Sequence, residues 1–409
     1  MSKIRIKYFG PIKEGYLEND SWMEVKKVTV FIGNQGAGKS TVAKVISTLT
    51  WLEKAINRGD IDIGKMSFNI FNKFFNYQKI DNYLSKRTYI EYFGDKYHIL
   101  YDRTQKHPII TEVKNKTYIV PKIMYVPSER NFLSAISDAF DVKGLPENLF
   151  TFAEELRKAQ KELSGKKINL PLEGYSYEYD ENKELSYVSG DDYKINLTEA
   201  SSGLQAFIPL YLVSSSLSSS VSKTQKKENK ELTVTQAVRF ANEMILILDD
   251  NSLTKKEQNK KTDLVKARFF SKCFHNIVEE PEQNLFPTSQ KDILFSLLKF
   301  NKLSDSNKLI MTTHSPYIIN YLTLSVKAGM VKSNLNSEDS KKKLDEIVPL
   351  DATLSAENLV IYELDEKDGS IKKLPDYKGL PSDENYLNNG LEESNELFAQ
   401  LQEIEKGWR

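Results

Sequence analysis

Cysteine is almost absent from this chain of 409 residues, since Cys273 is the only one. A single thiol has no partner for an internal disulfide, so disulfide-stapled scaffolds are excluded and a reducing compartment is expected. Long hydrophobic runs are missing too: the longest, such as Phe207–Val213 and Met244–Leu248, are far too short to cross a bilayer. The N-terminus alternates like a strand and lacks the apolar core of a signal peptide. We therefore expect a cytoplasmic protein with no membrane partner.

Net charge is also lacking, because 57 Lys and Arg residues balance 57 Asp and Glu residues. The composition therefore gives no overall electrostatic reason to bind nucleic acid. Two local runs, Lys223–Lys230 and Lys255–Lys261, are interpreted as solvated loops or helix faces, with contact to nucleic acid or a partner as the alternative. Internal repeats and sustained heptads are missing as well, which argues against a long coiled-coil arm.

What the sequence does contain is a glycine-rich stretch between an apolar run and a helical pattern. It follows Val28–Ile32 and matches the phosphate-loop pattern G-x-x-x-x-G-K-[ST] in the strand–turn–helix context that this pattern requires. Its glycines let backbone N–H groups face a phosphate chain, Lys39 supplies a charge for the β and γ oxygens, and the Ser40 hydroxyl can ligate Mg²⁺. The sequence therefore predicts binding of a nucleoside triphosphate with Mg²⁺, and this loop alone does not choose among kinases, GTPases and ATPases. The residues of this phosphate loop are Gly33, Asn34, Gln35, Gly36, Ala37, Gly38, Lys39, Ser40 and Thr41.

Two later apolar strands end in residues that suit phosphate hydrolysis. Phe274–Val278 leads into Glu279 and Glu280, a pair that can divide the work. Glu279 is expected in the Mg²⁺ shell, and Glu280 is expected to polarise the attacking water as general base. The strand Lys308–Thr312 leads into His314, whose imidazole can hydrogen-bond both the γ-phosphate and that water.

A second acidic pair competes for the same role. The apolar stretch Ile245–Leu248 ends in Asp249 and Asp250 and resembles a strand that ends in acids. It lies inside a lysine-rich region, and Asn251 follows it where a proline follows the glutamates. We therefore favour Glu279 and Glu280, and interpret the aspartates as an exposed helix or strand end.

Together these motifs resemble those of the ABC-type ATPase superfamily, and more closely its SMC/RecF/OLD-like branch. The resemblance is carried by the phosphate loop and by Ser201–Gln205, Glu279–Glu282 and Thr313–Pro316. It implies an α/β P-loop NTPase fold of ABC type, with a mixed central sheet, an antiparallel β subdomain and a helical signature subdomain. The signature departs from L-S-G-G-Q, because Ser201 replaces its leucine and Leu204 its second glycine.

The resemblance also implies domain boundaries and roles. Residues 1–409 would form one ATPase domain, with a first lobe at 1–131, a helical signature subdomain at 132–272 holding an insertion at 214–272, and a second lobe at 273–409. Ser202 and Gly203 would cap the γ-phosphate of a nucleotide bound by a second subunit. Asn284 and Leu285 would lie in the loop that contacts this second subunit. Arg130 would lie near the nucleotide or the interface. The expected assembly is a homodimer or higher oligomer closed through the nucleotide sites.

Two functions follow from the resemblance by analogy. The first is a regulatory or sensor ATPase for a separately encoded effector, a nuclease or toxin, in anti-phage defence. The alternative is a RecF-like DNA-repair ATPase that clamps duplex DNA. The acidic cluster Asp365–Asp368 precedes Gly369 in an expected hairpin, so we interpret it as a turn and not as a nuclease metal site. Residues 57–87 and 214–272 have no readable role and are where we expect partner specificity.

Overall fold

The phosphate-loop strand β4 (Val28–Gly33) lies inside a seven-stranded mixed sheet in the computed structural model. The structure describes residues 2–222, apart from 103, 106, 115–116 and 137–138, and residues 232–406. The strand order is β2-β16-β15-β4-β14-β13-β8. The other strands are β2 (Gly15–Tyr16), β8 (Pro121–Val126), β13 (Cys273–Glu279), β14 (Lys308–Thr312), β15 (Leu359–Leu364) and β16 (Ser370–Lys373).

Strands β8, β13, β14, β4 and β15 run parallel, and β16 turns back antiparallel on β15. Parallel strands are covered on both faces and therefore read as continuous apolar runs. In β4 the alternation divides the side chains between two cores, with Val28, Val30 and Ile32 on one face and Phe31 on the other. The carboxyl ends of the parallel strands meet at one edge of the sheet, which is where α/β proteins bind ligands.

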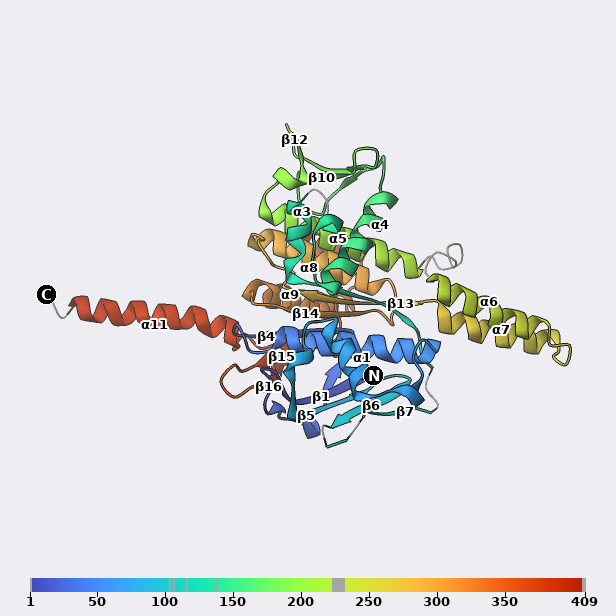
Figure 1. Cartoon of the computed structure of the whole chain (residues 1–409). Coiled ribbons are helices and arrows are strands. Elements are labelled where there is room, and N and C mark those ends of the chain that lie inside the picture. Colours follow the sequence, from blue (N-terminus) through green and yellow to red (C-terminus); the bar gives the residue numbers. More distant parts are fainter. Residues whose placement is uncertain are drawn as a thin grey trace.

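One face of the sheet is covered by α1 (Lys39–Arg58), with a five-stranded antiparallel sheet beyond it (Figure 1). The order in this second sheet is β3-β1-β5-β6-β7. Helix α2 (Phe68–Asn76) packs beside it through Phe71 and Phe75. The strands are β1 (Ser2–Phe9), β3 (Met23–Val25), β5 (Leu84–Phe93), β6 (Tyr97–Asp102) and β7 (Ile109–Glu112).

The opposite face is covered by a helical layer (Figure 1). It consists of α3 (Phe132–Ala135), α4 (Glu147–Glu162), α5 (Ser202–Ser222), α8 (Pro287–Lys302), α9 (Pro316–Lys332) and α10 (Glu338–Ile347). A small antiparallel sheet lies beyond α4 and α5, made of β9 (Lys167–Asn169), β10 (Ser176–Asp180), β11 (Leu185–Ser189) and β12 (Lys194–Asn196). The short pair β17 (Asp376–Tyr377) and β18 (Leu380–Pro381) precedes the last helix.

Two helical elements leave the body on opposite sides (Figure 1). On one side α6 (Val234–Leu248) and α7 (Lys255–Phe269) form a hairpin, in which Phe240 packs on Phe269 and Phe270. On the other side α11 (Tyr386–Lys406) extends from a root where the Tyr386 hydroxyl donates to Asp365 at 2.6 Å. Among the described residues, no helix combines the length and the apolar character needed to cross a membrane.

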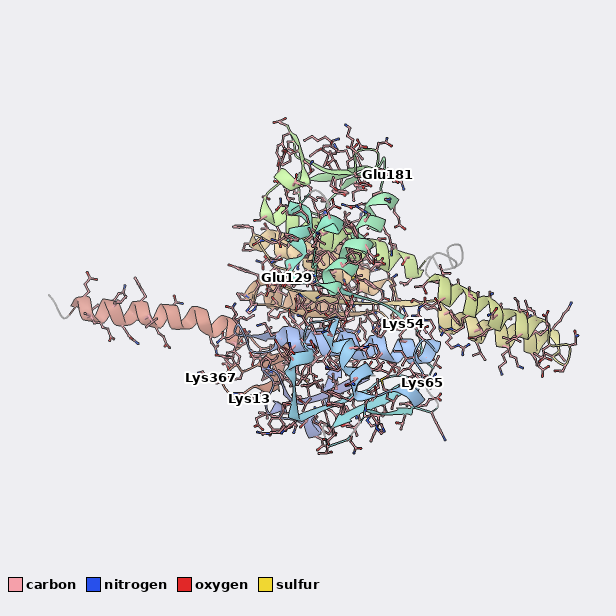
Figure 2. The ribbon with its side chains drawn as sticks, in the orientation of Figure 1. Lys13, Lys54, Lys65, Glu129, Glu181 and Lys367 are labelled. Carbon is pink, nitrogen blue, oxygen red and sulfur yellow. The ribbon has the colours of Figure 1, made fainter. Side chains whose placement is uncertain are left out.

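Side chains tie the layers of the body together (Figure 2). The Lys54 ammonium of α1 donates to the Pro121 carbonyl at the start of β8, at 2.6 Å, and to Ser271 just before β13, at 3.1 Å. Lys13 and Lys367 lie on neighbouring loops in Figure 2. The Lys13 N–H donates to the carbonyl of Gly369, two residues after Lys367, at 3.1 Å. This bond fixes the turn between β15 and β16 against the loop between β1 and β2.

The predicted α/β fold, with its mixed sheet, antiparallel sheet and helical layer, is confirmed. The first thirty-two residues contribute to two sheets, because β1 pairs antiparallel with β3, while β4, which is apolar on both faces, enters the central sheet. Asp249 and Asp250 follow helix α6 and not a strand. The predicted insertion at 214–272 begins inside α5, so the part that leaves the body is the α6–α7 hairpin. The run Lys223–Lys230 lies outside the described residues.

Candidate functional site

The phosphate loop follows β4 and opens α1. Gly33 has φ +142°, and a Cβ there would lie 2.3 Å from the Leu364 carbonyl oxygen of β15. Gly38, the residue before the helix, has φ +101°. Both positions therefore require glycine. The loop tip is exposed from Asn34 to Gly36, and the Asn34 amide donates to Glu366 at 2.9 Å, so the loop touches the turn between β15 and β16.

Lys39 is buried at the start of α1 and folds back on its own loop. Its ammonium donates to the carbonyl oxygens of Gly33 and Asn34, both at 2.8 Å. Burial lowers the pKa of Lys39 to about 8, although Glu280, Glu282 and Glu366 act in the opposite direction. A bound phosphate chain would replace these carbonyls with stronger, charged acceptors.

Three distant segments converge on this lysine because β4, β14 and β13 are neighbouring parallel strands. His314, just beyond β14, places Nδ1 3.5 Å from the Lys39 ammonium. Its Nε2 lies 3.7 Å from the Glu280 carboxylate, just beyond β13. Burial and the positive charge of Lys39 lower the pKa of His314, so its ring is neutral at pH 7, with one nitrogen that donates a hydrogen bond and one that accepts a hydrogen bond. These contacts form one row, which therefore holds three predicted site residues: Lys39 for the phosphates, His314 for the γ-phosphate and Glu280 as general base.

Glu280 combines an exposed carboxylate with a constrained backbone. Its φ is +43°, and its N–H donates to the Thr312 carbonyl of β14 at 2.9 Å. The side chain is 35% exposed, so a water molecule can reach it. Burial, and next the charge of Glu279, raise the pKa of Glu280. A raised pKa makes a carboxylate a better proton acceptor near neutral pH.

Glu279 is buried at the last position of β13. One carboxylate oxygen accepts from the Tyr125 hydroxyl, and the other accepts from the Ser128 N–H at 3.2 Å. These partners orient the carboxylate and leave each oxygen a second lone pair. Among the described residues no cluster of three or more metal-ligating side chains occurs. Mg²⁺ is usually held by one or two protein oxygens together with phosphates and water. Ser40 and Glu279 would be those protein ligands.

Arg130 lies next to the backbone of Glu279 and Glu280, and its place near the nucleotide or the interface stays a prediction. Its guanidinium is fully buried and donates only to backbone carbonyls among the described residues: Glu279 and Glu280 at 2.7 Å, Ala206 at 3.2 Å and Pro127 at 3.3 Å. Arg130 therefore lies behind Glu279 and Glu280, the carboxylate motif, and does not face the phosphate loop. Its bond to Ala206 joins this motif to α5. Burial lowers its pKa to about 10, still far above neutrality.

The signature residues are not brought to the phosphate loop of the same chain. Ser202 and Gly203 begin α5, where the first backbone N–H groups lack helical partners. Ser202 is exposed. A Cβ on Gly203 would lie 2.9 Å from the Asn284 carbonyl oxygen, so the two segments expected at the subunit interface touch each other. The arrangement leaves the α5 N-terminus open to a second molecule.

Sequence reasoning assigned no role to Glu282 or Tyr125. The Glu282 carboxylate accepts from the His314 N–H at 2.7 Å and so holds His314 against the segment that contains Glu279 and Glu280. Tyr125 sits opposite Ile277 in the register of β8 and β13, which brings its hydroxyl to Glu279. The sequence does not show that β8 pairs with β13, so it could not reveal the contact between Tyr125 and Glu279. A cavity of about 640 Å³ beside the motif is lined by Ser128, Glu129, Gln283 and apolar residues of α3 and α4.

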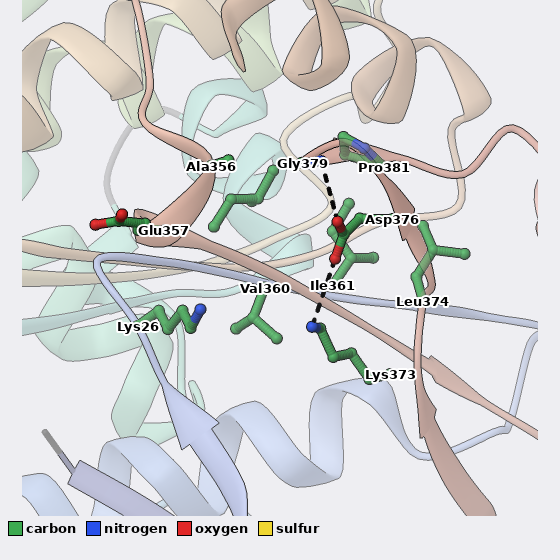
Figure 3. Close-up of a pocket in the computed structure, with 11 residues that line it drawn as sticks. Lys26, Ala356, Glu357, Val360, Ile361, Lys373, Leu374, Asp376, Gly379 and Pro381 are labelled. Atoms are coloured by element: carbon green, nitrogen blue, oxygen red, sulfur yellow. Dashed lines mark hydrogen bonds and ion pairs between the residues drawn. The ribbon is translucent and has the colours of Figure 1, made fainter. Parts of the chain in front are cut away.

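A second cavity, of about 250 Å³, lies away from this site (Figure 3). Its lining includes Lys26, Val360 and Lys373, at the amino end of β15. Lys373 pairs there with Asp376 at 3.7 Å. The phosphate loop is at the other end of this strand, since Leu364 pairs with Gly33. This cavity therefore takes no part in the nucleotide site.

The lowered pKa of Lys39 predicts how ATP affinity depends on pH. Bound phosphates favour the charged ammonium and raise its pKa, so binding must take up a proton wherever free Lys39 is neutral. We expect the ATP dissociation constant to be flat below about pH 8 and to rise up to about tenfold per pH unit above it. Calorimetric titration without turnover measures it. Lys39→Arg, which stays charged, should lose this slope, and an equal slope in both proteins would contradict the prediction.

No protein-family model matches the chain, and no curated protein matches its sequence. Solved structures are similar over most of the length. The SMC head domain from Thermotoga maritima is 10% identical, with 92% of this chain and 98% of that one covered and a TM-score of 0.39. An SMC head domain from Pyrococcus furiosus, bound to the C-terminal domain of ScpA, is 9% identical at 98% and 100% coverage, with a TM-score of 0.37. A dimeric ATP-binding cassette bound to ADP and phosphate is 11% identical at 92% and 100% coverage, with a TM-score of 0.27. The function proposed below rests on the residues of the site.

Proposed function

We propose that this chain is an ATP hydrolase of ABC type whose active site is completed when two copies dimerise around ATP. The observation that supports it is the row Lys39, His314 and Glu280 at the ends of neighbouring strands. In this proposal the loop N–H groups and Lys39 bind the phosphates, and Ser40 and Glu279 hold Mg²⁺, which would neutralise phosphate charge. Glu280 takes the proton of the attacking water, and His314 hydrogen-bonds the γ-phosphate. Ser202 and Gly203 cap that phosphate from the second copy.

ATP turnover at increasing protein concentration tests this proposal. A site completed by a second copy should give turnover that rises faster than linearly with protein and becomes linear once the dimer is saturated. Ser202→Arg, which blocks the open N-terminus of α5, should abolish this rise, whereas Ser219→Arg on the same helix serves as its control. Turnover that is strictly linear at all concentrations would mean that each chain hydrolyses ATP alone.

We further propose that the ATPase regulates a separately encoded effector, a nuclease or toxin, in anti-phage defence. This rests on the resemblance of the motifs to compact ATPases that occur beside such partners. Isolation of the protein from its native cells with Glu280→Gln, which would hold the ATP-bound dimer, should enrich one effector. A protein that hydrolyses ATP but stays unpartnered under these conditions contradicts the regulatory role and leaves the ATPase standing.

The RecF-like alternative is favoured by one observation, the exposed lysine run on α7. A clamp of this kind should bind duplex DNA only with ATP, and the affinity should fall steeply with salt as counterions are released. Binding that is insensitive to ATP, or no binding at low salt, would exclude it.

A further inference from the structure

The last helix carries an exposed apolar stripe. Beyond its root, residues 395–406 are all exposed, and the helix extends away from the body (Figure 1). Leu397, Leu401 and Ile404 are 54%, 64% and 55% exposed, and Phe398 beside them is 62% exposed. Spacings of four and three residues place the first three on one line of a helix. A lone helix that exposes such a line gains stability by packing it against another surface.

The α6–α7 hairpin carries a second stripe. On α6, Val234, Val238, Ile245 and Leu248 are 82%, 56%, 53% and 56% exposed. Their spacings of four, seven and three residues also follow one line of the helix. The face that packs on α7 is a different one, formed by Phe240, Met244 and Ile247. The exposed stripe on α6 therefore lies outside the contact between α6 and α7.

The charges of the two elements are opposite. Helix α11 holds five glutamates and one lysine, a net charge of −4. Helix α7 holds six basic and two acidic residues, a net charge of +4, and the whole hairpin, residues 234–269, carries +2. On α7, Lys260 and Lys261 lie one turn before Leu264, which is 63% exposed, so charge and apolar surface share a face. Two α11 helices would repel each other, whereas α11 and the hairpin attract.

We propose that α11 of one molecule packs on the α6–α7 hairpin of a second copy of this chain, and that the two apolar stripes meet between acidic and basic flanks. Because the two elements project from opposite sides of one molecule, the contact forms between molecules (Figure 1). It is head-to-tail, so repetition gives a ring if the rotation closes and a filament if it does not. The contact uses neither the phosphate loop nor α5, and it holds without nucleotide whatever the chain does with ATP.

Sedimentation equilibrium of the full chain without nucleotide tests the stripes. Wild type should associate more strongly at low salt than at high salt. Leu401→Ser with Ile404→Ser, and separately Val238→Ser with Ile245→Ser, should each weaken association at least tenfold. Gln402→Ser, an exposed polar position on the same helix, should leave it unchanged. Wild type that remains monomeric at low salt, or association that survives both pairs of substitutions, would overturn the proposal.

Charge reversal tests which surfaces meet. Lys260→Glu with Lys261→Glu makes one variant, and Glu403→Lys with Glu405→Lys makes the other. Each reversal brings its own helix from a net charge of four units to zero, so each variant alone should associate at least tenfold more weakly than wild type. Their mixture should associate again in alternating one-to-one order, because the unchanged acidic α11 of the lysine-reversed variant meets the unchanged basic α7 of the glutamate-reversed variant. A mixture that stays monomeric overturns the proposal. So does a lysine reversal that abolishes binding of duplex DNA while leaving self-association intact, because α7 would then serve nucleic acid.

Discussion

Glu280→Gln should lower the ATP turnover number about 10²- to 10⁴-fold, because the amide cannot take the proton of the attacking water. ATP affinity should be nearly unchanged, because Glu280 lies outside the phosphate loop. Its carboxylate is 3.7 Å from the His314 ring. A single-turnover assay of phosphate release, with ATP binding measured separately, checks both expectations.

The matched control for this prediction is the competing acidic pair. Asp249 and Asp250 follow α6, where Asp250 accepts from the Ser252 N–H at 3.1 Å, and both belong to the projecting hairpin. Asp249→Asn with Asp250→Asn should therefore leave turnover as it is. If the aspartates proved essential and Glu280→Gln stayed active, the catalytic assignment would move to the hairpin.

Arg130→Lys should damage both stability and catalysis while sparing ATP binding. Lysine cannot reach the carbonyls of Pro127, Ala206, Glu279 and Glu280 together. Each buried carbonyl left unpaired costs about 1–3 kcal/mol, whereas the Glu280 carbonyl keeps its bond from the Gln283 N–H at 3.0 Å. A loosened Glu280 backbone should lower the turnover number up to about 10²-fold. Denaturant unfolding, the turnover number and the ATP dissociation constant together measure the effect.

Arg87→Lys provides the control for this substitution. Arg87 is exposed and lies 3.8 Å from the centre of the Tyr8 ring, so its replacement should change little. An Arg130→Lys protein that lost ATP affinity but kept its stability and turnover number would return Arg130 to the nucleotide, where the sequence alone placed it.

The sequence predicted the parts of the site that sit at the ends of buried parallel strands. Lys308–Thr312 has the predicted bounds, because strands covered on both faces are continuous apolar runs. Once these strands are parallel neighbours, the residues that follow them must meet. Chain order does not give the strand order β4-β14-β13, so Lys39, Glu280 and His314 were predicted to act together from their motifs.

Other features depended on contacts that have no pattern in the sequence. Arg130 bonds to carbonyls, which every residue possesses, so nothing in the chain marks Ala206 as its partner. Ile245–Leu248 read as a strand because the window was short. Over Val234–Leu248 the apolar residues follow a helical period, and the capping box of Thr233 and Gln236 marks where that helix begins.

The turn at residues 365–369 joins two parts of the molecule that otherwise lie apart. Glu366 accepts from Asn34 of the phosphate loop at 2.9 Å, and Asp365 accepts from Tyr386 at the root of α11 at 2.6 Å. Thermodynamic linkage makes any coupling across this turn reciprocal. If ATP shifts the head-to-tail association by some factor, a neighbouring molecule bound to α11 must change the ATP affinity of this chain by the same factor.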